Sequence, residues 1–308
     1  MSTLMSRVRW LLPLATIAAL VFSVAGGAAA AAPQYPLTLK TANGKVTIAH
    51  IPSRIVSLSA TATEDLFAVG AGKQVVAVDP YSTYPANAPR TKLSGFTPNV
   101  EAIAKYRPDL VVVSDDMHHI VAQLGKLQIP VLVEPAAVNL NGVYAQIEQL
   151  ARATGHTAGA KHVVAGMQRQ VNAIVRSTPR PSTPLNVYHE LDQTYYSADS
   201  HTFIGQMYSL LGLQNIADKA ASSTDYPQLS AEYIVASNPD LIVLADTVCC
   251  GQTRATVAAR PGWSTIAAVK TGEVVPINDS IASEWGPRIV LFLKAVSSAV
   301  KTLEGQAK

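Results

Sequence analysis

Two stretches of the chain follow the same plan: EAIAKYRPDLVVV at residues 101–113 and EYIVASNPDLIVL at residues 232–244. In each, a glutamate opens a segment with helical periodicity, a Pro-Asp pair begins seven residues later, and a run of branched apolar side chains follows. This order predicts a short helix, a turn and a buried strand. One glutamate near a helix N-terminus is ordinary, because it complements the helix dipole. Two at matched positions indicate either two lobes of similar plan or a chance likeness between generic α/β units.

Short apolar runs alternate with segments of helical periodicity along most of the chain. The runs predict buried strands, because parallel sheets covered on both faces favour continuous apolar stretches. In the first half they lie at residues 55–58, 75–78, 110–113 and 131–133. The segments at 61–69 and 99–106 have helical spacing, and Asn99 is a suitable N-cap for the second. This alternation predicts an α/β fold with a largely parallel sheet.

One segment departs from the alternation. Between residues 158 and 176 apolar side chains recur at helical spacing, which predicts one amphipathic helix of about 20 residues and about 30 Å. The proline-rich segment 177–184 ends it, and strands resume beyond it. They are expected at 186–189, 241–244 and 274–275. We therefore expect two Rossmann-like α/β lobes joined by one long helix, with a ligand cleft between the lobes. The expected boundaries are 1–32 for a leader, 33–52 for an N-terminal extension, 53–157 for the first lobe, 158–178 for the linking helix and 185–304 for the second lobe.

The first 32 residues have the features of a secretory signal peptide. Arg7 and Arg9 precede an apolar run over residues 10–24, and glycines and alanines follow. Cleavage near residues 30–32 is expected, because no polar stop-transfer pattern follows; a retained membrane anchor is the alternative. No cysteine near the cut offers an attachment point for a bacterial lipid anchor. We therefore expect export to a periplasmic or other extracytoplasmic compartment.

Composition and charge exclude several classes of protein. Of the 308 residues, 48% are apolar and 15% charged, which is too apolar for intrinsic disorder. The formal net charge is +3, and Arg7 and Arg9 supply two of these charges, leaving +1 for the rest. Nucleic-acid binding driven by bulk charge is not expected from such a balance.

The sequence lacks the common signatures of catalysis. Gly70-Ala71-Gly72-Lys73-Gln74 has neither the earlier glycine nor the following Ser or Thr of a phosphate loop, and predicts a helix C-cap and turn. No nucleophile elbow and no dinucleotide fingerprint occur. Possible metal ligands gather at residues 114–119, SDDMHH, but adjacent helical histidines diverge by about 100° and rarely reach one ion. We expect no catalytic residues, no dedicated metal site and no cofactor, and we expect that the protein is not an enzyme.

The chain has two cysteines, Cys249 and Cys250, side by side. In an oxidising compartment they can pair with each other. Adjacent Cα atoms lie about 3.8 Å apart, closer than the usual disulfide span of about 4.4–6.8 Å, so the ring would be strained. We favour this vicinal disulfide; two free thiols or bonds to another molecule are the alternatives.

Large aromatic side chains lie in segments with the composition of loops. Loops normally favour small polar residues, so rings there either pack beneath the loop or contact a ligand. Together they are suited to lining a cleft for a bulky, partly apolar ligand, with tyrosine hydroxyls as hydrogen-bonding groups. The rings are Tyr81, Tyr84, Phe96, Tyr195, Tyr196, Tyr226 and Trp285.

From about residue 52 to residue 300 the chain resembles the solute-binding proteins of ABC importers for cobalamin and ferric siderophores. The order and spacing of several segments support the resemblance, although no single segment is specific. These segments are PSRIVSL at 52–58, YSTYP at 81–85, the Glu101 unit, GLQNIA at 212–217, the Glu232 unit, RPGW at 260–263 and GPRIV at 286–290.

The resemblance implies a partner. In such proteins a surface glutamate on each lobe meets arginines of the two permease subunits, and Glu101 and Glu232 match those positions. Carboxylate–guanidinium pairs give oriented, bidentate docking, and matched positions in two lobes suit a twofold-symmetric permease. We expect a monomer that works with an ABC permease dimer and its ATPase, and that binds no nucleic acid.

The resemblance also suggests the ligand. The YSTYP segment and Phe96 are most similar to the cobalamin-binding branch, where rings pack on the corrin; Arg288 is the best placed arginine for an anionic siderophore, unless it only pins a helix start. Asp115 lies where a cobalamin site would present an aromatic ring, and we count it among the cleft-lining polar groups. A haem or metal-chelate binding protein is the alternative, and a chelatase-type enzyme is a more distant one, for which only His118 and His119 would serve.

Overall fold

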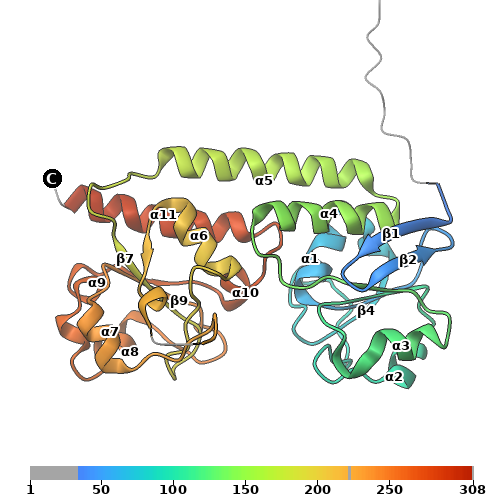
Figure 1. The fold of residues 1–308 in the computed structure, drawn as a ribbon, viewed down its shortest axis with the longest axis horizontal. Coiled ribbons are helices and arrows are strands. Elements are labelled where there is room, and N and C mark those ends of the chain that lie inside the picture. The colour runs from blue at the N-terminus through green and yellow to red at the C-terminus, as the bar shows by residue number, and fades with distance from the viewer. Residues whose placement is uncertain (1–33, 221–222, 307–308) are drawn as a thin grey trace, which may run out of the picture. The chain divides into compact units, whose positions relative to one another are not determined.

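A computed structural model describes residues 34–220 and 223–306; the predicted leader lies outside these ranges. The first four-stranded sheet has the order β4 (Val75–Val78), β3 (Ile55–Leu58), β5 (Leu110–Val113) and β6 (Val131–Val133), and all its strands are parallel. The second has the order β10 (Val274–Pro276), β9 (Leu241–Leu244), β7 (Asn186–Glu190) and β8 (Gln214–Asn215), again all parallel. Figure 1 shows these sheets as the centres of the two lobes. The predicted α/β class is confirmed.

The two sheets share one topology. In each, the first strand in the sequence lies between the second and the third, and the fourth follows the third at the edge. The matched Pro-Asp pairs have the same role: the Asp109 carboxylate accepts the Arg54 backbone N–H at 2.9 Å, and the Asp240 carboxylate accepts that of Asn186 at 2.8 Å. Each aspartate therefore ties the start of the third strand to the start of the first. The repeat seen in the sequence corresponds to a repeat of structure.

Helices cover the sheets. In the first lobe they are α1 (Ala60–Val69), α2 (Val100–Ala104), α3 (Ile120–Gly125) and α4 (Leu140–Thr154), with 3₁₀ turns at Ala71–Gln74 and Met117–His119. In the second they are α6 (Phe203–Leu211), α7 (Ala231–Ser237), α8 (Arg254–Ala258), α9 (Ala267–Thr271), α10 (Asp279–Ser283) and α11 (Ile289–Gln306), with 3₁₀ turns at Ile216–Lys219 and Trp263–Thr265. As predicted, Gly70 caps α1 in the left-handed conformation, with φ 104°.

The long helix α5 (Thr157–Ser177) has 21 residues and begins and ends one residue from the predicted bounds. It packs against α1 and α4 of the first lobe and α11 of the second (Figure 1). Val164, Met167 and Val171 are buried on its inner side. A Cβ at Gly159 would lie 2.0 Å from the Val69 carbonyl oxygen, so only glycine allows α5 to approach the end of α1 this closely.

An N-terminal hairpin was not predicted. Strands β1 (Leu37–Thr41) and β2 (Gly44–Ile48) pair antiparallel within the segment predicted as an extension. The Asn43 side chain donates to the Val131 carbonyl at 3.0 Å and accepts from the Val133 N–H at 3.2 Å. The hairpin turn thereby satisfies backbone groups of β6, an edge strand that would otherwise expose them.

Three apolar clusters form the core of the described residues. The largest includes side chains from β3, α1, α4 and α5 as well as from β7, β9, α6 and α11, so it continues through both lobes. A smaller cluster in each lobe lies under the helices on the other face of its sheet. The shared cluster gives the lobes a common apolar base beneath α5.

Candidate functional site

Loops follow the carboxyl ends of both parallel sheets, which is where α/β proteins usually bind ligands. In the first lobe, Tyr81 is 62% exposed and Phe96 is 64% exposed, although both rings are large and apolar. Their centroids lie 5.4 Å apart at an interplanar angle of 88°, an edge-to-face pair. The structure therefore brings together two of the rings that the sequence suggested, and leaves both largely open to solvent.

Buried polar groups hold the loops that carry this pair. Asp79, 3% exposed, accepts the Ser82 N–H at 2.9 Å and its hydroxyl at 2.7 Å. Burial raises the pKa of the Asp79 carboxyl, although the bonds from Ser82 oppose that shift. A Cβ at Gly95 would lie 2.4 Å from the Leu58 carbonyl oxygen, so this glycine lets the Phe96 loop rest on the end of β3.

Tyr84 of the first lobe lies against Arg288 of the second lobe. The Arg288 Cζ lies 4.1 Å from the Tyr84 ring centroid, and the ring is 45% exposed. Arg288 also pairs through Nε with Glu64 of α1 at 2.5 Å and through Nη2 with Glu284 at 3.0 Å. Its charge is thus already balanced by carboxylates. A groove of about 500 Å³ runs beside these residues, lined in part by Tyr84, Arg288 and Leu291.

The segment before Arg288 makes a second contact with the first lobe. The Trp285 indole N–H donates to the Gln146 Oε1 of α4 at 3.0 Å, and the ring is half-buried against the shared core. Gly286 lies so close to Glu64 that an added Cβ would be 3.0 Å from the Glu64 carboxyl carbon. Trp285 is therefore packed between elements of both lobes, unlike Tyr81 and Phe96.

Several carboxyl groups gather near this connection. Burial raises the pKa of Glu284 to about 7, with a further increase from Glu64 and an opposing effect of Arg288. Burial likewise raises the pKa of Glu134 to about 7. Asp65 is fully buried, and burial together with the neighbouring Glu64 raises its pKa well above the usual range. No local sequence pattern indicates this group, because its members come from α1, the end of β6 and the segment after α10.

In the second lobe, Tyr195 and Tyr196 follow β7 and have different surroundings. The Tyr195 ring packs 5.6 Å from that of Trp263, with the Arg260 guanidinium over both. Tyr196 is 40% exposed. Arg260 forms a bidentate pair with Glu190 at the end of β7. RPGW at 260–263 marked the family resemblance, but sequence reasoning assigned no role to Arg260 or Glu190.

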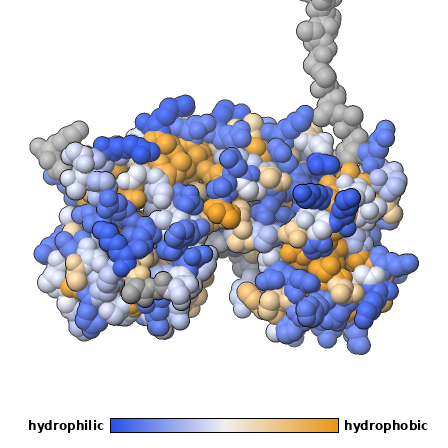
Figure 2. All heavy atoms as spheres, in the orientation of Figure 1, coloured by the Kyte–Doolittle hydropathy of each residue, from blue (hydrophilic) through white to orange (hydrophobic). Residues whose placement is uncertain are grey.

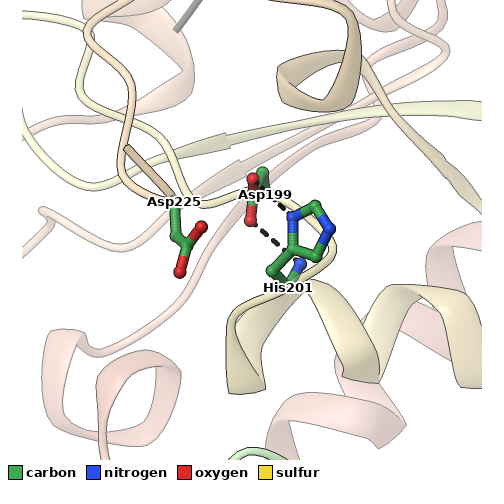
Figure 3. Close-up of side chains that lie close together, drawn as sticks. All are labelled: Asp199, His201 and Asp225. Atoms are coloured by element: carbon green, nitrogen blue, oxygen red, sulfur yellow. Dashed lines mark hydrogen bonds and ion pairs between the residues drawn. The ribbon is translucent and has the colours of Figure 1, made fainter. Parts of the chain in front are cut away.

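Tyr226 is 45% exposed. The residue before it, Asp225, belongs to a group of acidic and imidazole side chains drawn in Figure 3. One possible metal-ligand atom from each of Asp199, His201 and Asp225 lies within 4.8 Å of the other two. The His201 Nδ1 is already bonded to Asp199 at 3.0 Å, and the histidine side chain is 81% exposed. The hydrogen bond to Asp199 and the negative charge around it raise the pKa of His201. We interpret this group as a surface ion pair.

The cysteine loop follows β9 in the second lobe. Cys249 and Cys250 are joined as a vicinal disulfide, with Cα atoms 3.8 Å apart. The Asp279 carboxylate accepts the backbone N–H groups of Val248 at 2.9 Å and Cys249 at 2.7 Å. The loop is therefore held by the start of α10, and Val248 is 69% exposed at its tip.

The remaining predicted residues are exposed polar side chains. Asp115 is exposed two residues after the end of β5, and His118 and His119 are exposed in the turn that follows, both with positive φ. Glu101 and Glu232 are exposed in the first turns of α2 and α7. These two helices have side-chain caps of the same kind, from Asn99 and Ser230.

Figure 2 shows the surface hollowed between the two lobes, on the side away from α5.

No helix among residues 34–220 and 223–306 combines the length and apolar content needed to cross a membrane.

Comparison with known proteins agrees with this architecture. The chain is 33% identical over 276 residues to a cobalamin-binding protein of Halobacterium salinarum, covering 86% of this chain and 74% of that one. It is 30% identical to the ABC transporter substrate-binding lipoprotein YvrC of Bacillus subtilis, with 86% of each chain covered. Among solved structures, the periplasmic heme-binding protein HutB of Vibrio cholerae superposes with a TM-score of 0.69 at 26% identity, covering 80% of this chain and 97% of that one.

The profile of one family, described as periplasmic binding protein, matches residues 55–280, which include both sheets and the long helix between them. The family suggested by the sequence segments is thereby confirmed, and the chain belongs to the periplasmic binding protein family.

Proposed function

We propose that this protein is an extracytoplasmic solute-binding protein that delivers a bulky, largely uncharged corrinoid to an ABC importer. The observation that carries the proposal is the exposed edge-to-face pair of Tyr81 and Phe96 at the carboxyl edge of the first sheet. Two large rings held open to solvent have no role in the core, and they offer flat apolar contact to a ligand. Tyr196 and Tyr226 add exposed rings from the second lobe.

Charge favours a corrinoid over an anionic siderophore. Arg288, the arginine that the sequence offered for an anion, already pairs with Glu64 and Glu284. Recruiting it for an anionic ligand would leave the Glu64 carboxylate, 2% exposed, without its partner, at considerable cost. Cyanocobalamin has no net charge and makes no such demand. The name of the relative from Halobacterium salinarum points to the same ligand class.

Haem is the second candidate, because the HutB structure is named as heme-binding and shares 26% of its sequence with this chain. Haem carries two propionates, which require cationic or hydrogen-bonding partners. Exposed Tyr196 and Tyr226 offer hydroxyls, but Arg288 is already paired.

Direct titration decides between these ligands. Purified protein is titrated with cyanocobalamin, haemin and a ferric hydroxamate, and binding is followed by visible absorption and by calorimetry. The proposal expects cyanocobalamin to bind at least tenfold more tightly than the other two. Tighter binding of haemin would replace the corrinoid with haem, and no binding of any of the three would contradict the proposal.

Docking to the permease is proposed at Glu101 and Glu232. Both are exposed and open the first turns of the matched helices α2 and α7, one in each lobe. The equivalent surroundings support two equivalent contacts, as a permease dimer with twofold symmetry would make.

A further inference from the structure

Arg260 lies where two loops of the second lobe meet. Its Nη1 and Nη2 each lie 2.6 Å from an oxygen of Glu190, and Nη2 also donates to the Gln252 Oε1 at 2.8 Å. The Glu190 side chain is fully buried and that of Arg260 is 11% exposed, so water screens the pair little. Bidentate charge-assisted bonds fix geometry as well as adding energy. Arg260 is therefore held rigidly at the end of β7.

The first loop carries the two tyrosines. Tyr195 has φ 71°, in the left-handed region that a bulky residue rarely adopts without support. Its ring lies 5.3 Å from the Arg260 Cζ and 5.6 Å from the Trp263 ring, and Arg260 in turn lies 4.5 Å over Trp263. This stack supports the unusual turn at Tyr195. The turn leaves the next residue, Tyr196, exposed.

The second loop carries the cysteine pair. The Gln252 N–H and the Cys250 N–H both donate to the Asp246 carbonyl, each at 3.3 Å, and the Gln252 Nε2 lies 3.5 Å from the Cys250 carbonyl oxygen. Gln252 thus belongs to the disulfide loop through its backbone and to Arg260 through its side chain. Gln252 therefore links the Cys249–Cys250 loop to the Tyr195 stack through hydrogen bonds.

We propose that Arg260 is a positioning residue that couples the Cys249–Cys250 loop to the Tyr195–Tyr196 loop, so that ligand occupancy and the oxidation state of the cysteines influence each other. The inference rests on the proposed function, because Tyr196 is one of the rings assigned to the ligand.

Opening the cysteine pair releases the second loop. A dithiol gives two electrons and two protons to the Cys249–Cys250 bond, which becomes two thiols, while the dithiol itself closes to a disulfide. Without the ring, Gln252 no longer has a fixed position against Arg260, and the support of Tyr195 weakens. Coupling between two equilibria is reciprocal, so a ligand that binds the oxidised form more tightly must oppose reduction by the same factor.

The wild-type protein is measured first. Cyanocobalamin affinity is compared between the oxidised protein and the protein reduced with dithiothreitol. The ratio of reduced to oxidised dithiothreitol that half-reduces the pair is then measured by alkylation and intact mass, with and without saturating cyanocobalamin. We expect reduction to weaken cyanocobalamin binding about tenfold. We also expect half-reduction of the cysteine pair to need an about tenfold higher ratio of reduced to oxidised dithiothreitol when cyanocobalamin is present. Equal affinities of the two redox forms would overturn the coupling.

Two variants test the residues. Gln252→Ala removes the side-chain link between the loop and Arg260, together with the contacts of the same side chain to the Cys250 carbonyl and the Thr256 hydroxyl. It should bring the two redox forms to within threefold of each other. Arg260→Lys keeps the charge but loses the bidentate fork and the stack, and should weaken binding in both forms. Arg254→Gln is the matched control, since Arg254 is exposed on α8 and its Nε donates to the Val274 carbonyl of β10. A Gln252→Ala protein that keeps the full wild-type difference would reject Gln252 as the link.

The test remains decisive even without a ligand. If no corrinoid binds the wild type, the proposed function fails, and the half-reduction ratio of Arg260→Lys alone decides the coupling. A change of threefold or more relative to wild type and Arg254→Gln supports it. An unchanged ratio, in protein whose far-ultraviolet circular dichroism matches wild type, refutes it.

Discussion

Arg288 lies with its Nε 2.5 Å from the Glu64 Oε2, and its backbone N–H donates to the other oxygen of the same carboxylate at 2.8 Å. One residue thus joins the start of α11 in the second lobe to α1 in the first. Because Glu64 is 2% exposed, this contact is shielded from water and salt. Together with Trp285–Gln146 it ties the lobes at a point other than α5.

Arg288→Gln should destabilise the protein strongly. The change leaves the buried Glu64 carboxylate without a cation, and breaking a buried pair in this way costs about 3–5 kcal/mol. Chemical unfolding in urea measures the loss. Glu284→Gln is the control, because it keeps the Glu64–Arg288 pair, and we expect it to cost less than Arg288→Gln. Equal losses in the two variants would show that Glu64 is not the partner that matters.

Glu134→Gln should alter the pH dependence of stability. Burial raises the pKa of Glu134 from 4.5 to about 7, so the folded protein holds a proton that the unfolded chain releases above pH 4.5. This contribution to stability is therefore complete below about pH 4.5 and is lost as the pH rises to about 7. A neutral glutamine avoids the loss and should make the variant more stable relative to wild type at pH 8 than at pH 5, by up to about 3 kcal/mol.

Urea unfolding at both pH values measures this difference. Glu148→Gln, which removes an exposed carboxylate from α4, is the matched control. A stability difference between Glu134→Gln and wild type that stays constant from pH 5 to pH 8 would contradict the raised pKa.

Tyr81→Ala and Phe96→Ala should each weaken ligand binding by about 2 kcal/mol, as central aromatic contacts often do. Their rings touch edge to face, so the double variant should lose less than the sum, with a coupling of about 0.5–1.5 kcal/mol. Calorimetric titration with cyanocobalamin measures all three. Leu127→Ala, which truncates an exposed side chain between α3 and β6, is the control. Affinities within threefold of wild type in both single variants would place the ligand elsewhere.

Glu101→Arg and Glu232→Arg should slow transport strongly while leaving ligand affinity unchanged. Each reversal puts a cation against the arginines expected on the permease, and like charges in contact oppose docking. The rate of cyanocobalamin uptake into proteoliposomes containing the permease and its ATPase measures the effect, and we expect at least a tenfold fall for either variant. Glu148→Arg controls for the added positive charge. Wild-type uptake rates in both variants would exclude these glutamates as the docking contacts.

The sequence alone determined most strands of the two sheets, the long helix and their order. Continuous runs such as 110–113 and 241–244 are strands because both faces of a parallel sheet are covered, which leaves no polar position in the run. The helical spacing over 158–176 was sufficient to predict α5, and the matched units at 101–113 and 232–244 indicated two lobes. The hairpin β1–β2 was missed because its alternation is short and its turn, at residues 42–43, pairs with β6 from far along the chain.

The tertiary structure decided which candidate residues face solvent and which are already engaged. Loop composition singled out Tyr81, Phe96 and Trp285, and the family resemblance singled out Arg288. The structure shows Tyr81 and Phe96 as exposed rings, whereas Trp285 and Arg288 join the lobes. Their partners Glu64 and Gln146 lie more than 130 positions away in the sequence, and local pattern holds no information about such pairs. The same holds for Glu190 and Arg260, 70 positions apart. Periodicity reports the side of an element that is buried; only the folded chain fixes which buried or half-buried charges meet, because that depends on how separate elements pack.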